Sequence, residues 1–208
     1  RGQVFETRLF YDPTTPGNAP LDAGGALDRT FTLRLPDGFN GAGTLDIYVT
    51  ANDAPNFGDA LIEASVGVQF PRNDNQAQIT IQSAARPYAD LRPALSAPAT
   101  GSAGAAVNLT WTVTNNGGAA TPVNGWDDQI IISQDAIIGN ADDVVIGTFR
   151  HTGALASSGQ YTRTESVVLP AQLSGNYYLG VRTDSGEEVF EPDTRFNNTS
   201  SASAIAIS

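Results

Sequence analysis

The chain has 208 residues and carries 22 acidic against 11 basic side chains, for a net charge of −11. This charge argues against a nucleic-acid backbone or an anionic membrane surface as a partner, because both are themselves negative. With no cysteine and one histidine, the sequence excludes disulfide scaffolds, zinc–thiolate sites, iron–sulfur clusters and histidine-rich metal cages. No apolar run approaches the roughly 20 residues of a membrane span, so we expect no membrane insertion.

The first 86 residues show the two-residue periodicity of β-strands. Apolar and polar residues alternate at residues 31–35, 45–49 and 79–81, as in strands with one face buried. Residues 59–64 could form one helical turn, but no stretch of the chain shows three turns of helical periodicity. We therefore predict an all-β chain.

From residue 87 onwards, turn-forming residues separate seven predicted strands, at residues 91–96, 106–114, 127–133, 144–150, 161–168, 176–183 and 203–207. Three consecutive isoleucines at residues 130–132 predict a strand that is buried on both faces. Trp111 alternates with Leu109 and Val113, so we expect it to pack between two sheets. Seven short strands in about 120 residues predict an immunoglobulin-like β-sandwich.

An internal repeat relates the two parts of the chain. Residues 23–36 align without gaps on residues 157–170 and share a glycine, an Arg-Thr pair and a Leu-Pro pair. Beyond this block, the segment that starts at Gly41 parallels the segment that starts at Gly175. We therefore predict that residues 87–208 form one complete sandwich. Residues 1–86 are expected to be the C-terminal part of a second sandwich, consisting of its last four strands.

Four strands of a sandwich leave an apolar face and a sheet edge without cover. Two explanations are open: the missing strands lie upstream, or another chain supplies them by strand addition. Since the chain starts at Arg1 rather than at a methionine, we expect a processed product or a piece of a longer protein. The expected partners are adjacent repeats of the same polypeptide or copies of this chain.

Short motifs follow one another in a characteristic order in the second part. They are Ala89-Asp90-Leu91, Asn115-Asn116-Gly117, Trp126-Asp127-Asp128, Ser133-Gln134-Asp135, Asp142-Asp143, Ser174-Gly175-Asn176, Val189-Phe190-Glu191 and Asn197-Asn198. This order resembles the CARDB family, the cell-adhesion-related domains found in bacteria. The resemblance implies an immunoglobulin-like fold, tandem arrays in large extracellular or cell-surface proteins, and no enzyme activity. The first part departs from the pattern by a longer stretch at residues 51–71, to which we assign no role.

The most acidic stretch, residues 126–143, holds five aspartates and one asparagine with no arginine among them. Ca²⁺ takes six to eight oxygen ligands, mainly carboxylates and carbonyls of short loops. A loop that starts at Asp135 and turns at Gly139 predicts a calcium site, which an aspartate of the preceding strand could complete. The candidate ligands are Asp127, Asp128, Asp135, Asn140, Asp142 and Asp143. The alternative is a solvated loop in which the aspartates act as turn formers and caps.

Other polar and aromatic residues leave alternatives open. Residues 187–193 form a second acidic segment, which we interpret as a solvated hairpin paired with Arg195; a metal or interdomain role is the alternative. His151 is expected to be a surface imidazole, and no Gly-x-Ser-x-Gly nucleophile motif occurs. The resemblance favours a structural or adhesive module of an adhesin, stalk or fibre. The alternative is a module that binds a glycan or a host protein. Such a module needs an exposed aromatic side chain or a polar cleft, and Trp126 is the candidate contact if it is exposed rather than in the core.

Overall fold

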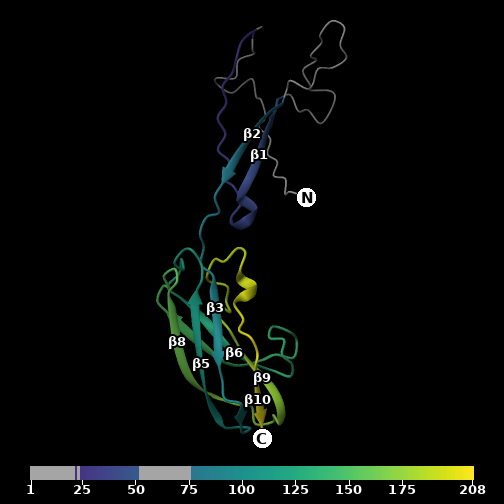
Figure 1. Ribbon diagram of the computed structural model, residues 1–208, viewed down its shortest axis with the longest axis vertical. Coiled ribbons are helices and arrows are strands. Elements are labelled where there is room, and N and C mark those ends of the chain that lie inside the picture. Colours follow the sequence, from purple (N-terminus) through teal and green to yellow (C-terminus); the bar gives the residue numbers. More distant parts are fainter. Residues whose placement is uncertain (1–21, 23, 52–75) are drawn as a thin grey trace. The chain divides into compact units, whose positions relative to one another are not determined.

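The computed structural model describes residue 22 and residues 24–51 and 76–208. The chain divides into two compact units, Arg1–Ala85 (unit 1) and Arg86–Ser208 (unit 2). The described residues form β-strands and two short 3-10 helices, η1 (Gly38–Gly41) and η2 (Arg195–Asn197) (Figure 1). The prediction of an all-β chain is confirmed. The helical turn expected at residues 59–64 lies outside the described residues, as does the long stretch at residues 51–71 apart from its first residue.

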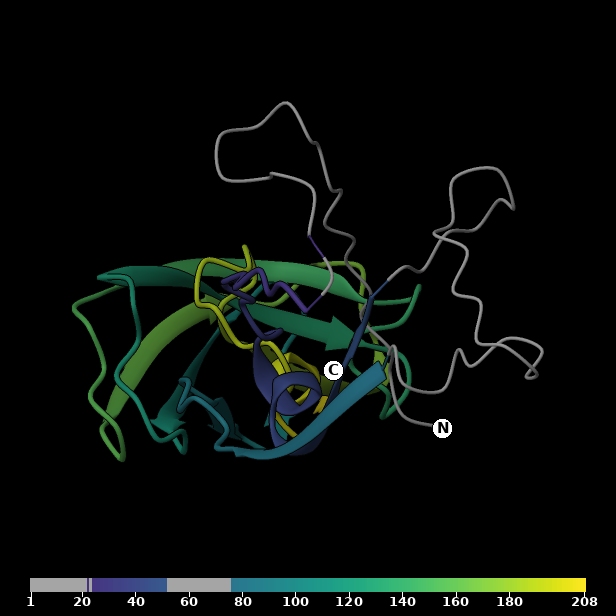
Figure 2. The ribbon, with the colours of Figure 1, turned by 90° about the horizontal axis from the view of Figure 1, so that it is seen from above.

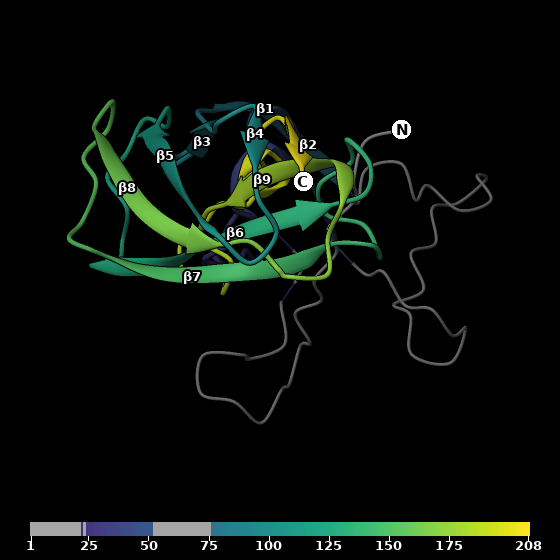
Figure 3. The same cartoon turned by 90° about the horizontal axis from the view of Figure 1, so that it is seen from below.

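Unit 2 is a sandwich of two sheets. The five-stranded sheet has the order β4 (Thr100–Gly101), β10 (Ser203–Ile207), β9 (Gly175–Arg182), β6 (Gly125–Ser133) and β7 (Val144–Thr152). The three-stranded sheet has the order β3 (Leu91–Ser96), β5 (Ala106–Asn115) and β8 (Gln160–Val168). The two sheets face each other across the core (Figures 2 and 3). The predicted immunoglobulin-like sandwich is confirmed, and the short β4, which pairs in parallel with β10, is an addition to the predicted strands.

The core of unit 2 follows the predicted alternation. Every second residue of β5 is buried, and Trp111 is fully buried at its centre. The three isoleucines of β6 are at most 4% exposed, as expected for a strand that is covered on both faces. On the outer face, the side chain of Ile138 lies over Gly180, where a Cβ atom would approach it to 2.7 Å. The loop after β6 therefore covers part of the five-stranded sheet, and Gly180 makes room for it.

Unit 1 contains an antiparallel hairpin of β1 (Gly43–Thr50) and β2 (Gln76–Ser83). Cross-strand hydrogen bonds between polar side chains line one face; Thr80, for example, donates to Asp46 at 2.6 Å. The apolar residues of both strands lie on the opposite face, because side chains alternate along a strand.

The strand predicted at residues 31–35 is wrong, because the structure has no β-ladder there. Phe31 and Leu33 are both 49% exposed. In unit 2 the segment aligned with these residues is β8, and β8 pairs with β5. The described residues of unit 1 contain no counterpart of β5. An extended segment becomes a strand only when a neighbour accepts and donates its backbone hydrogen bonds.

Candidate functional site

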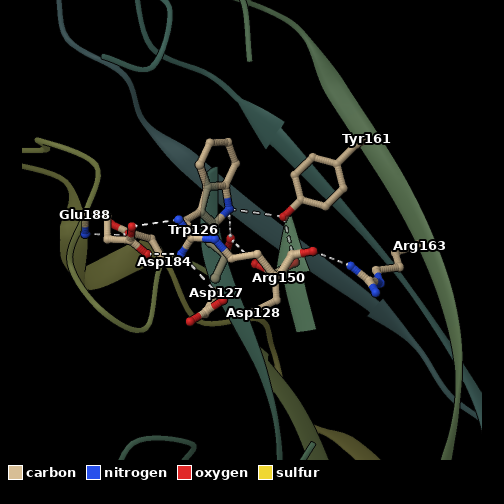
Figure 4. Close-up of polar contacts among 9 residues, drawn as sticks. Trp126, Asp127, Asp128, Arg150, Tyr161, Arg163, Asp184 and Glu188 are labelled. Atoms are coloured by element: carbon tan, nitrogen blue, oxygen red, sulfur yellow. Dashed lines mark hydrogen bonds and ion pairs between the residues drawn. The ribbon is translucent and has the colours of Figure 1, made fainter. Parts of the chain in front are cut away.

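A carboxylate in the core joins the two sheets of unit 2. Alternation along β6 directs Asp127 outwards and Asp128 inwards, and Asp128 is fully buried. Its Oδ2 accepts hydrogen bonds from Trp111 Nε1 at 2.7 Å and from the Tyr161 hydroxyl at 2.6 Å. Its Oδ1 accepts one from the Thr183 hydroxyl at 2.6 Å. These three donors come from β5, β8 and the residue after β9, so Asp128 connects both sheets. Figure 4 shows Asp128 beside Tyr161.

Three aromatic rings pack together beside this carboxylate, and two of them are stacked. Trp126 is fully buried, and its Nε1 donates to the Tyr161 hydroxyl and to Thr183 Oγ1 at 3.2 and 3.1 Å. The His151 ring stacks on Tyr161 with centroids 3.8 Å apart and an interplanar angle of 13°. Trp126 therefore belongs to the core, and the alternative of an exposed Trp126 contact is wrong. His151 is half-buried in this stack rather than a plain surface imidazole.

The network around Asp128 holds segments of both sheets together. Burial, followed by the charge of Asp128, raises the pKa of the Tyr161 phenol far above its usual range. The phenol therefore stays protonated and serves as a hydrogen-bond donor. Oδ2 of Asp128 accepts two hydrogen bonds and Oδ1 accepts one, and all three donors belong to the same unit. The arrangement is typical of a polar cross-brace within a core.

His151 gives a prediction that can be tested directly, because it is the one histidine of the chain. Burial lowers its pKa, a shift that nearby Asp128 opposes. The neutral ring therefore stabilises unit 2 above the ordinary pKa of about 6.5, and this stability is lost as the pH falls through the folded value. We expect the ring proton signals in NMR to titrate below this value in the folded chain. In urea they should titrate at the ordinary value. Equal midpoints in the two states would contradict the burial of the ring in the stack.

The aspartates at the end of the acidic loop accept hydrogen bonds from the loop's own residues. Asp142 Oδ2 accepts from Ser133 Oγ at 2.9 Å and from the Gln134 amide at 2.8 Å. The Gln134 amide is the main reason that the pKa of Asp142 is lowered. Asp143 accepts from the Gly139 amide. The turn-forming alternative of the sequence analysis is therefore realised in these contacts.

The six expected calcium ligands do not come together as one group. Asp135 accepts hydrogen bonds from the Ile137 amide at 2.7 Å and from Asn140 Nδ2. Asp127 and Asp128 lie near the start of β6, six and five residues before its last residue, Ser133, which is about 16–20 Å at roughly 3.3 Å per residue. The expectation that either aspartate completes the ligand shell of the loop is therefore wrong. Across the part of the chain that the structure describes, no three or more His, Cys, Asp or Glu side chains are grouped so as to hold a metal ion.

Outside the core, Asp127 belongs to an ion-pair group on the surface. Arg150 of β7 pairs with Asp127 at 3.5 Å and also with Glu188 (Figure 4). All three side chains are more than a third exposed, so solvent screens their attraction. The group connects β6, β7 and the loop after β9.

The second acidic segment is more buried than predicted. Glu191 is 2% exposed; its Oε1 accepts from the Leu91 amide at 2.5 Å and its Oε2 from Asn198 Nδ2 at 2.6 Å. Burial is the main cause that raises the pKa of Glu191. Asp184, also 2% exposed, accepts from two backbone amides of the same loop. The prediction of a solvated hairpin at residues 187–193 is wrong for Glu191, although Arg195 does pair with Glu187 at 2.7 Å.

The Glu191 contacts attach the start of one sheet to the loop that precedes the last strand of the other. The same region contains the motifs at residues 89–91, 189–191 and 197–198 that carry the resemblance described above. Residues 88–202 match the family model of CARDB, which is more than half of the chain. The chain belongs to the CARDB family. CARDB is a non-catalytic family of cell-adhesion-related domains. The match lies within unit 2, hereafter the CARDB unit, in which Asp128 and Glu191 are buried hydrogen-bond acceptors.

Several solved structures are similar to the CARDB unit. The CARDB domain of the PF1109 protein from Pyrococcus furiosus, solved in complex with di-metal ions, is 16% identical, with a TM-score of 0.44; the match covers 58% of this chain and 90% of that chain. A β-glucosidase from Listeria innocua is 16% identical, with a TM-score of 0.38, over 58% of this chain and 16% of that chain. The sporulation control protein Spo0M from Bacillus subtilis is 15% identical, with a TM-score of 0.37; the match covers 58% of this chain and 49% of that chain.

No curated protein matches the chain. Within the described ranges, the structure contains no helix of the length and apolar character that crossing a membrane requires.

Proposed function

We propose that this chain is a non-enzymatic structural or adhesive module of a bacterial extracellular adhesin, stalk or fibre, exposed at the cell surface. One observation carries the proposal: the buried acidic side chains of unit 2 act as acceptors between distant segments of its own fold. Asp128 bridges the two sheets and Glu191 connects the start of β3 with the segment before β10. Such contacts favour rigidity over chemistry, as a spacer requires.

The positions of the ends of unit 2 support a place in a tandem array. The chain enters unit 2 ahead of β3 at one end of the sandwich, and it leaves after β10 at the opposite end (Figure 1). Units of this kind add end to end along a fibre. The neighbours of this unit in the proposal are adjacent repeats of the same polypeptide.

Force spectroscopy on tandem copies of the full chain tests the structural role. We expect each copy of unit 2 to unfold in one step at a measurable force, because Asp128 couples the two sheets into one cooperative structure. The step should release about 3.3–3.6 Å per residue of unit 2, less its folded length. Unfolding without a distinct force peak would contradict a structural spacer. Binding of the chain to a glycan or host-protein array would instead favour the ligand-binding alternative.

The proposal includes one Ca²⁺ in the loop at residues 135–143, with Asp135, Asn140 and Asp143 as ligands. In the described residues Asp143 Oδ1 is buried and has no hydrogen-bond partner, which leaves it available to a cation. The lowered pKa of Asp142 keeps a further negative charge in the same loop. Backbone carbonyls and water would have to supply the remaining ligands.

Thermal melts of the chain with millimolar calcium and with chelator test this part of the proposal. We expect the melting temperature of unit 2 to rise by a few degrees with calcium, because a ligand that binds only the folded state stabilises it. The substitution Asp135→Asn should abolish the rise, whereas Asp127→Asn, outside the loop, should leave it in place. Equal melting temperatures with calcium and chelator would remove calcium from the proposal and leave the structural role untouched.

A further inference from the structure

The hairpin of unit 1 is the structural counterpart of the hairpin β9–β10 in unit 2. Both hairpins begin with a glycine of positive φ, Gly43 at 96° and Gly175 at 99°. In both, this glycine pairs with the last residue of the second strand, Ser83 in unit 1 and Ile207 in unit 2. The register places Gly43, rather than Gly41, at the position of Gly175. Position by position, β1 therefore corresponds to β9 and β2 to β10.

Equivalent positions of the two hairpins differ in burial. Val181 of β9 is fully buried in the core, whereas its counterpart Val49 in β1 is 65% exposed. Ile79 of β2, on the same face as Val49, is 59% exposed. In unit 2, β3 and β5 of the opposite sheet cover the corresponding face. Leu45, Ile47 and Ile81 on this face are half-buried. The apolar face of β1–β2 thus has the composition of a sandwich interior but is less buried than the corresponding face of unit 2.

Among the described residues, one edge of the hairpin also has no neighbouring strand. β9 pairs with β10 on one side and with β6 on the other, where Ile130 lies opposite Val181. β1 pairs with β2, and no described residue pairs with its other edge. Residues 31–35 correspond to β8 and lack the partner that β5 provides in unit 2. In unit 2, β3 and β5 cover the equivalent face, β6 pairs with the equivalent edge, and β5 pairs with the equivalent of residues 31–35. These three strands lie within one continuous segment, residues 91–133.

We infer that the apolar face and free edge of β1–β2 form a docking surface for the first half of another CARDB unit, a segment with the strand pattern of residues 91–133. A β6-like strand would add to the edge of β1, and β3- and β5-like strands would cover the apolar face. The inference concerns unit 1 alone, so it is independent of the adhesive role proposed for the whole chain. It identifies the partner by its strand pattern, because unit 2 of the same chain shows what covers this face in a complete sandwich.

Joining a copy of residues 86–143 ahead of Arg1 of the full chain tests the inference. We expect amide hydrogen exchange to slow by at least about tenfold in β1, in β2 and in residues 31–35, because these segments gain ladder partners and cover. Exchange in unit 2 should not change and serves as the internal control. A second fusion carries Ile130→Asp and Ile132→Asp in the added copy, which keeps its length but removes its apolar face; it should give no protection.

Two charge substitutions at neighbouring residues of β1 test whether the added segment contacts the apolar face of unit 1. Val49→Asp lies on the apolar face and should abolish the protection in the fusion, whereas Tyr48→Asp lies on the opposite, polar face and should preserve it. Unchanged exchange in unit 1 of the fusion would overturn the inference. Light scattering of the unextended chain tests the competing occupant. A concentration-dependent dimer that Val49→Asp removes would identify a second copy as the occupant and overturn the inference as well.

Discussion

Asp128→Ala is expected to destabilise unit 2 by about 3–5 kcal/mol, the largest effect of any single substitution that we predict. The substitution removes the acceptor of Trp111 Nε1, of the Tyr161 hydroxyl and of the Thr183 hydroxyl. Trp111 and Thr183 are fully buried, whereas Tyr161 is partly buried. Buried donors without acceptors cost more than the hydrogen bonds themselves contribute, because water cannot replace the missing partner. Urea unfolding followed by tryptophan fluorescence measures the change, since both tryptophans of the chain lie in unit 2.

The neighbouring aspartate provides the control for this prediction. Asp127→Ala removes the same side chain from the outer face of β6, where solvent screens its pairing with Arg150. Its unfolding midpoint should stay close to that of the parent chain. Asp128→Asn should fall between the two, because the amide keeps the volume and one acceptor oxygen but turns its NH₂ towards donors. Similar midpoints for Asp127→Ala and Asp128→Ala would contradict a role for Asp128 as a brace between the sheets.

Glu191→Ala is expected to cost about 2–4 kcal/mol, whereas Glu191→Gln should cost much less. Alanine leaves the Leu91 amide and Asn198 Nδ2 without an acceptor in the interior. Glutamine keeps an acceptor for the Leu91 amide. Asn198 Oδ1 has no hydrogen-bond partner among the described residues. If the Asn198 side-chain amide rotates by 180°, this oxygen can accept a hydrogen bond from the glutamine NH₂. Urea unfolding of the three chains at one pH measures both differences.

The difference in stability between Glu191→Gln and the parent chain is expected to depend on pH. Burial raises the pKa of Glu191, and the nearby charges of Asp184 and Asp90 add to the shift. A raised carboxyl pKa means that the folded state holds the proton more tightly, so this contribution to stability is present at low pH and is lost as the pH rises through the folded pKa. Glutamine does not titrate. The stability of Glu191→Gln relative to the parent should therefore increase from pH 4.5 to pH 7. A constant difference over this range would contradict a raised pKa.

The strands of unit 2 were predictable because their information is local. In a strand with one buried face, each inward residue is apolar and each outward residue is polar, so the sequence itself contains the period. The predicted strand at residues 203–207 agrees with β10, and the predicted strand at 91–96 agrees with β3. The order of short motifs was sufficient to indicate the CARDB family before any contact was known, because each motif is read from neighbouring residues.

The acidic residues were harder to interpret. Five aspartates within 18 residues indicate a charged region, but Asp127 and Asp128 differ in role only because one faces solvent and the other the core. For Glu191 a signal was present: it follows the fully buried Val189 by two residues, the spacing that returns a side chain to the same face of an extended chain. That spacing alone does not reveal a buried carboxylate, because burial depends on donors that other segments bring.

Alternation and turn residues act over a few neighbouring positions, so the all-β class, the family and the strands of unit 2 could be predicted from the sequence. The roles of residues with distant partners became clear only from the folded chain. The donors to Asp128 lie 17, 33 and 55 residues away in the chain, and the Leu91 amide lies 100 residues from Glu191. Residues 31–35 alternate as a strand does, yet form none, because a β-ladder requires a second strand that no local pattern supplies.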